Sequence, residues 1–233
     1  MTHTPPPDMP IRDAASIVVL RRDRHGAAVL MGMRGHAAVF MPSKFVFPGG
    51  AVDAADADLA LARPLPEPHR RRLQAEPREA NPASPDAIAA AALRELAEET
   101  GLLIGQPDDA APALAGFAEA GLRPDAGGLG YFFRAITPPG RPRRFDAHFF
   151  VADALTVAGD PEDFSRACDE LSHLHWVALQ DARNLDLPFI TEVVLAELAE
   201  LAGSVAFDAA LPVPGSVPFF DNRGAAPRFV QIT

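Results

Sequence analysis

The feature that most constrains the fold is a run of helix-forming residues from 87 to 100 that carries three closely spaced glutamates. Ser84 is a good N-cap residue, and Pro85 suits the first helical position. The run itself consists of strong helix formers, and Gly101 suits the residue that ends a helix. The sequence therefore predicts a helix over about 85–100.

The glutamates Glu95, Glu98 and Glu99 share one side of this helix, because at about 100° per residue they fall within an arc of about 100°. Glu95 and Glu99 repel each other, and the C-terminal end of a helix disfavours anions. Ile88 and Leu96 mark the apolar side, which includes Glu99, so we expect that glutamate to be at least partly buried. A hard divalent cation, Mg²⁺ or Mn²⁺, would neutralise the cluster. The alternative is a solvated acidic face, which is the commoner explanation of E-x-x-E-E alone.

Short strands and helices alternate along the rest of the chain. The apolar segments Ala14–Leu20 and Ala27–Met33 flank a charged turn, which is typical of a hairpin. Further strands are expected at 45–47, 131–136, 145–151 and 174–179, and further helices at 190–201 and, with a weaker pattern, 109–120. This mixture predicts one layered α/β (α+β) domain.

The domain is expected to span residues 13–203. Residues 1–12 are predicted to be a flexible N-terminal tail, and the proline-rich residues 204–233 a C-terminal extension. The stretch 51–84 is rich in Ala, Asp, Arg, Glu and Pro and has no long apolar face, so we interpret it as a helical or loop insertion on the surface.

Charge and composition exclude several classes of function. The chain of 233 residues has 21 basic and 31 acidic residues, a net charge of −10, which argues against binding of nucleic acid or an anionic membrane. The single cysteine, Cys168, permits no internal disulfide and no multi-cysteine zinc site. No apolar stretch has the length of a membrane span, and the N-terminal residues lack the apolar region of a secretory signal, so a cytoplasmic location is expected.

Two segments carry a family resemblance. Arg-Glu-Leu-Ala-Glu-Glu-Thr-Gly-Leu at 94–102 resembles the second half of the Nudix box, R-E-U-x-E-E-x-G-U, where U is apolar. Phe-Pro-Gly-Gly at 47–50 resembles the strand end and loop that open the box. The full pattern is G-x5-E-x7-R-E-U-x-E-E-x-G-U. Between Gly50 and Arg94 the chain has about 30 residues more than the pattern has between its glycine and its arginine, so we place an insertion inside the box. Counting back from Arg94 puts Asp86 at the first glutamate of the pattern.

The resemblance covers about residues 16–201 and implies an α-β-α sandwich around a mixed β-sheet. It also implies metal-dependent hydrolysis of a nucleoside diphosphate linked to another group, which is a small-molecule substrate. Arg94 would orient the glutamates, and Glu170, which precedes the strand expected at 174–179, is the candidate general base with Glu98 as its rival. The expected ligands of Mg²⁺ or Mn²⁺ are Glu95, Glu98, Glu99 and the backbone carbonyl of Gly49.

The substrate is expected to be coenzyme A or acyl-coenzyme A, because the insertion and the segments 40–50, 143–152 and 187–191 resemble the coenzyme A diphosphatase branch of the family. The predicted substrate-binding residues are Arg34, Phe47 and Arg144, and Arg144 is placed to meet a 3′-phosphate. The cluster Arg70–Arg72 is better explained as a solvated face.

Several alternatives remain open at this level. An ADP-ribose, NADH or dinucleotide pyrophosphatase is the rival within the enzyme class. A non-catalytic nucleotide-binding Nudix module and a structural protein with an acidic helix are the rivals outside it. A homodimer is expected by family analogy alone.

Overall fold

The computed structural model describes residues 9–36, 38, 40–78, 82–114, 116–224 and 226–233. The elements along the chain are β1 (Ile11–Asp23), β2 (Gly26–Arg34), β3 (Phe45–Val46), β4 (Gly49–Ala51), the 3-10 helix η1 (Ala54–Asp58), α1 (Glu67–Gln74), α2 (Pro85–Thr100), β5 (Gly105–Pro107), α3 (Phe117–Ala120), β6 (Leu122–Pro124), β7 (Gly130–Ile136), β8 (Arg144–Asp153), η2 (Ala154–Thr156), β9 (Leu171–Ala178), η3 (Ala182–Asn184), α4 (Phe189–Gly203), β10 (Val217–Asp221) and β11 (Arg228–Ile232).

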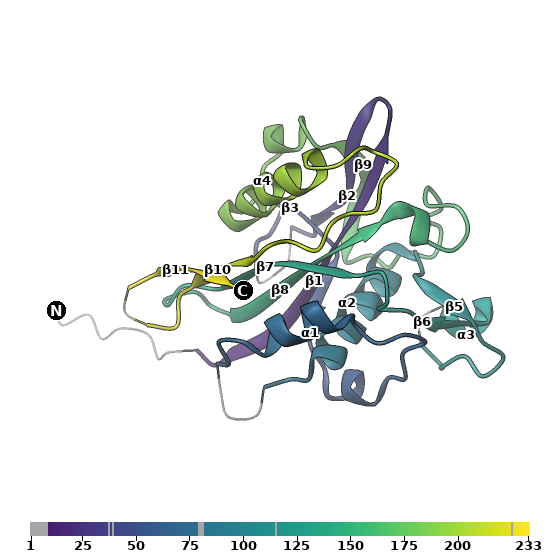
Figure 1. The fold of residues 1–233 in the computed structure, drawn as a ribbon, viewed down its shortest axis with the longest axis horizontal. Coiled ribbons are helices and arrows are strands. Elements are labelled where there is room, and N and C mark those ends of the chain that lie inside the picture. Colours follow the sequence, from purple (N-terminus) through teal and green to yellow (C-terminus); the bar gives the residue numbers. More distant parts are fainter. Residues whose placement is uncertain (1–8, 37, 39, 79–81, 115, 225) are drawn as a thin grey trace.

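A mixed nine-stranded sheet forms the middle layer, with the strand order β11-β10-β7-β8-β1-β2-β3. Strand β4 also pairs with β1, and β9 also pairs with β2. The β1–β8 and β10–β7 pairs are parallel and the remaining pairs are antiparallel. Helix α4 lies over one face of the sheet and helices α1 and α2 over the other (Figure 1). The predicted α-β-α sandwich around a mixed β-sheet is confirmed.

Strand β1 separates two buried clusters because successive side chains of a strand point to opposite faces. Ile17 belongs to the same buried cluster as Leu96 of α2. Its neighbour Val18 belongs to a second cluster with Leu198 of α4. All four side chains are fully buried, so this strand is packed on both faces and fixes the positions of both helices.

Helix α2 begins and ends where the sequence predicts. The Ser84 hydroxyl oxygen accepts a hydrogen bond from the Ala87 N–H, and the Gly101 N–H donates to the Ala97 carbonyl. Gly101 has φ +75°, and a Cβ there would lie 2.9 Å from the Arg166 Cβ, so glycine is required for two reasons.

The stretch 51–84 is not the surface excursion that was expected. It contains the predicted short helices, but Leu65 and Leu73 are buried in the cluster that holds α2. The buried ring of His69 accepts a hydrogen bond through Nδ1 from the Tyr131 N–H of β7, over 3.2 Å. The apolar residues of the stretch 51–84 are few and are separated by prolines, so they form no periodic pattern that would indicate burial.

The domain extends beyond the predicted limits at both ends. Strand β1 already includes residues 11 and 12, and residues 1–8 of the expected tail lie outside the described part of the chain. In the expected extension at 204–233, β10 and β11 pair with the main sheet, and Val217 and Phe219 are fully buried.

One local prediction fails, because the helix expected over 109–120 is reduced to Phe117–Ala120. The strand expected at 45–47 is observed as β3, and Gly49 and Gly50 belong to the next strand, β4. Within the described residues, no helix combines the length and apolar character needed to cross a bilayer.

Candidate active site

Helix α2 and strand β4 meet at Glu99. Its Oε2 accepts a hydrogen bond of 2.8 Å from the Gly49 N–H, and the residue is 1% exposed. The other oxygen, Oε1, is buried and has no hydrogen-bond partner in the described part of the chain. An unpaired carboxylate oxygen in this position is costly, so the arrangement calls for a partner that the protein itself does not provide.

The two glycines of β4 allow the helix to approach the sheet. A Cβ at Gly50 would lie 2.2 Å from Oε1 of Glu95, and a Cβ at Gly49 would lie 2.5 Å from the carbonyl oxygen of Ala15. Any side chain at these two positions would displace the glutamates or the strand. The glycines therefore belong to the geometry of the site.

Arg94 is the centre of the hydrogen bonds around the glutamates. It donates to Glu95 over 2.8 Å, to Glu98 over 3.2 Å and to the Ala51 carbonyl over 3.0 Å. Its other partner is Asp56 of η1, whose two carboxylate oxygens lie 2.8 and 3.0 Å from Arg94 nitrogens. Although burial lowers the pKa of Arg94, the hydrogen bonds to Asp56 and the charge of Glu95 raise it above its ordinary value.

Asp56 occupies the supporting position that the sequence pattern assigned to Asp86. Asp86 instead accepts hydrogen bonds from Arg70 and from the Leu65 N–H, and it braces the segment before α1. The signal for Asp56 was present, because counting forward from Gly50 by the G-x5-E spacing reaches residue 56. The extra residues therefore follow the first acidic position, and counting back across them gave the wrong carboxylate.

Arg34 and Glu170 form a second pair of charged residues near Glu99. Arg34 ends β2 and donates a hydrogen bond of 2.7 Å to Glu170, which precedes β9. The charge of Glu170 raises the pKa values of both Glu95 and Glu99, which places it electrostatically within reach of the cluster. Strand pairing between β2 and β9 brings these two residues together.

The cluster carries more negative charge than its surroundings stabilise. Burial raises the pKa of Glu99 to about 8; the Gly49 hydrogen bond opposes this shift, and the charge of Glu95 adds to it. Burial also raises the pKa of Glu95, against the charge of Arg94. Glu98 is more open, with 41% of its side chain exposed.

A different cluster of side chains, two aspartates and a histidine, is grouped closely enough to hold a metal ion. Among the described residues, Asp13, Asp146 and His148 place ligand atoms within 4.8 Å of one another, whereas the three glutamates are not so tightly grouped. Arg134 donates two hydrogen bonds to Asp146, over 2.8 and 2.7 Å, and Arg78 donates to Asp13 over 3.0 Å. Because guanidinium groups already neutralise these carboxylates, we identify the group as a buried ion-pair network.

Two of the predicted substrate-binding residues lie in the core, which corrects both assignments. Phe47 is 4% exposed and packs in the cluster on the α4 side of the sheet. Arg144 is 2% exposed and donates to the carbonyls of Thr137 and Asn222, over 3.0 and 2.8 Å, so it joins β8 to the segment after β10. Neither side chain is accessible to a ligand.

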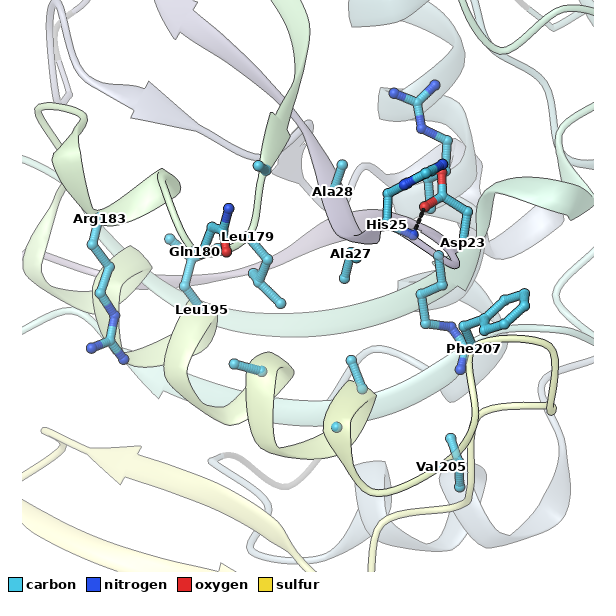
Figure 2. Close-up of a pocket in the computed structure, with 17 residues that line it drawn as sticks. Asp23, His25, Ala27, Ala28, Leu179, Gln180, Arg183, Leu195, Val205 and Phe207 are labelled. Atoms are coloured by element: carbon cyan, nitrogen blue, oxygen red, sulfur yellow. Dashed lines mark hydrogen bonds between the residues drawn. The ribbon is translucent and has the colours of Figure 1, made fainter.

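Two cavities differ in their relation to the cluster. A cavity of about 690 Å³ lies between the tip of the β1–β2 hairpin, the end of β9 and α4, and none of the box glutamates lines it (Figure 2). The Asp23–His25 hydrogen bond marks one end of it and Arg183 the other (Figure 2). A second cavity of about 440 Å³ is lined by Glu98 together with Arg166 and Cys168. This second cavity lies at the C-terminal end of α2, next to Glu98.

Comparison with known proteins identifies the family. No family model matches the chain. The crystal structure of a NUDIX hydrolase from Alicyclobacillus acidocaldarius is 30% identical, with a TM-score of 0.61, and the match covers 88% of this chain and 99% of that one. The Caenorhabditis elegans nudix hydrolase 7 is 29% identical over 181 residues, which are 71% of this chain and 51% of that protein, so the chain spans about half the length of this curated relative. On this match at 30% identity over 88% of its length, the chain belongs to the Nudix hydrolase superfamily.

Proposed function

We propose that the chain hydrolyses the pyrophosphate bond of a nucleoside diphosphate linked to another group, with a divalent cation bound at the glutamates of α2. The observation that carries this proposal is the state of Glu99. Its carboxylate is buried, one oxygen accepts from the Gly49 N–H, and the other has no partner among the described residues. A folded protein keeps such a group where a ligand stabilises it.

The residues present fit a hard divalent cation. Glu95, Glu98, Glu99 and the Gly49 carbonyl offer only oxygen atoms, which Mg²⁺ and Mn²⁺ prefer. Burial raises the pKa of Glu99 to about 8, and a bound cation would favour its charged form. A cation bound there would neutralise phosphate charge and make water a better nucleophile. Either metal suits this set of donors.

The chain's own residues position the reacting groups. Arg94, held by Asp56, fixes the rotamers of Glu95 and Glu98. Glu170 is the candidate acceptor for the proton of the attacking water, since its carboxylate is half exposed and lies near the cluster. Glu98 is the rival for this role, because 41% of its side chain is exposed, compared with 12% for Glu95.

Coenzyme A or acyl-coenzyme A is the substrate class that the sequence resemblance favours. With Phe47 and Arg144 assigned to the core, this preference rests on the position of the inserted residues and on three sequence segments. ADP-ribose, NADH and dinucleoside polyphosphates are the rivals. The intact glutamates disfavour a non-catalytic module.

The test is a panel of these pyrophosphates with Mg²⁺ or Mn²⁺, with products identified by mass. We expect one class to be cleaved, and we expect Glu98→Gln and Glu99→Gln each to lower the rate by at least about 100-fold. The matched control is Glu200→Gln, an exposed glutamate near the end of α4. No cleavage of any member, or full activity in both box variants, would refute the proposal.

A further inference from the structure

Arg34 has hydrogen-bonding capacity that its surroundings do not use. Only 22% of its side chain is exposed, and one of its terminal nitrogens donates to Glu170. Its Nε is buried and has no hydrogen-bond partner in the described part of the chain. A guanidinium carries five N–H donors in a fixed planar arrangement, and it is suited to bind a phosphate through two of them at once.

Glu99 provides the complementary observation. Its buried Oε1 lacks a donor among the described residues, as the buried Nε of Arg34 lacks an acceptor. The two residues are close enough for the charge of Arg34 to lower the pKa of Glu99, yet no hydrogen bond joins these two described side chains. Each unpaired group costs free energy, and one ligand that combines a cation with an anionic oxygen satisfies both.

We propose that Arg34 is shared between Glu170 and a phosphate oxygen of the substrate, so that a bound diphosphate withdraws Arg34 from Glu170 and frees that carboxylate beside the reacting bond. This inference rests on the proposed function. It assigns Arg34 as a substrate-binding residue that is also a positioning residue for Glu170.

The energetics favour such an exchange. Glu170 has 52% of its side chain exposed, and an ion pair with one exposed partner contributes little stability. A diphosphate offers several anionic oxygens and a bidentate contact, which is the stronger class of hydrogen bond. Glu170 therefore serves as a replaceable partner that keeps the arginine oriented before the substrate binds.

The experiment measures ADP binding by calorimetry in the presence of Mg²⁺ for four proteins: the natural chain, Arg34→Gln, Glu170→Gln and the double variant. We expect Arg34→Gln to weaken binding by at least about tenfold, because a charge-assisted contact is lost. We expect Glu170→Gln to tighten binding about twofold to fivefold, because the competitor for Arg34 is removed. In the Arg34→Gln background, Glu170→Gln should have no effect.

The double variant separates competition from simple charge relief. If removal of Glu170 tightened binding equally with and without Arg34, the gain would come from reduced repulsion, and the shared role would be refuted. Unchanged ADP binding in Arg34→Gln would also refute it. Should Arg34→Gln fail to fold, Arg34→Lys replaces it, with a smaller loss of affinity expected because the charge remains.

A matched control comes from a second ion pair of similar exposure, Arg21 with Glu162, at 37% and 55%. Arg21→Gln and Glu162→Gln should leave ADP binding unchanged. Turnover of the substrate panel is measured on the same proteins. If the natural chain cleaves no member while the binding pattern holds, the hydrolase proposal fails and the assignment of Arg34 stands. Cleavage without the binding pattern refutes the assignment of Arg34 and supports the hydrolase proposal.

Discussion

At the scale of single residues, the groups that oppose stability are those assigned to chemistry. Glu99 is a buried acid at the C-terminal end of a helix, next to a second acid one turn away. Burial raises its pKa to about 8, so the charged form is disfavoured in the metal-free protein. The rest of helix α2 compensates for the free-energy cost of burying this one side chain.

Glu99→Gln should therefore stabilise the metal-free protein while it removes the response to metal. The amide keeps an oxygen to accept from the Gly49 N–H and carries no charge to bury. In a chelator we expect the melting temperature of the variant to equal that of the natural chain or to exceed it by a few degrees. In excess Mg²⁺ we expect the natural chain to be stabilised and the variant to show no such increase. Thermal unfolding under both conditions checks this, and a variant that is less stable in the chelator contradicts it.

The buried His148 leads to a prediction about how stability depends on pH. It is 2% exposed, and burial lowers its pKa to about 4, with the charge of Asp146 opposing and that of Arg134 adding. The unfolded chain has an ordinary histidine pKa of about 6.5, so between about pH 6.5 and 4 the unfolded state binds a proton that the folded state does not. Stability should fall as the pH falls through that window, by up to about 3 kcal/mol.

The measurement is urea unfolding at about pH 7 and about pH 4.5, on either side of most of that window. The loss between these two values should be smaller in His148→Gln than in the natural chain. The control is His25→Gln at the exposed hairpin tip, which should keep the full loss. An equal loss in both variants would show that another group titrates in this window.

At the scale of elements, local chemistry predicted α2 completely because both ends are specified by single residues. Ser84 and Gly101 act within one helical turn, and the residues between them are mostly strong helix formers. The prediction for the stretch 51–84 failed for the opposite reason. Leu65 and Leu73 are buried by contact with α2 and the sheet, and nothing in their immediate neighbours indicates this.

Leu65→Ala tests the status of that stretch. Leu65 is 1% exposed, so its removal leaves a cavity, and we expect a loss of about 2–5 kcal/mol in the free energy of unfolding. The same substitution at Leu155, which is 91% exposed, should change it by no more than about 0.5 kcal/mol. If urea unfolding showed the same loss for both substitutions, the stretch 51–84 would be the surface insertion that the sequence predicted.

At the scale of the whole molecule, the sheet is completed by residues far apart in the sequence. Strand β10 pairs in parallel with β7, and β11 closes the edge beyond it. The Asn222 side-chain amide donates to the Ile136 carbonyl over 2.8 Å, and Arg72 donates to the Pro214 and Gly215 carbonyls over 2.6 and 2.8 Å. The family motif predicted the central sandwich, whereas these contacts could not be read from a proline-rich segment that lacks a periodic pattern.

Phe219 and Phe229 decide whether this C-terminal hairpin is part of the domain. They lie on adjacent strands, and Phe219 is fully buried, with the Arg134 guanidinium 4.3 Å from its ring centre, whereas Phe229 is 54% exposed. Phe219→Ala should cost about 3–5 kcal/mol, because it opens a cavity and leaves that cation without its aromatic contact. Phe229→Ala should cost less than about 1 kcal/mol. We expect a single cooperative unfolding transition that shifts only for Phe219→Ala, which would assign the hairpin to the folding unit that holds the glutamates. A separate extension would instead tolerate both substitutions alike.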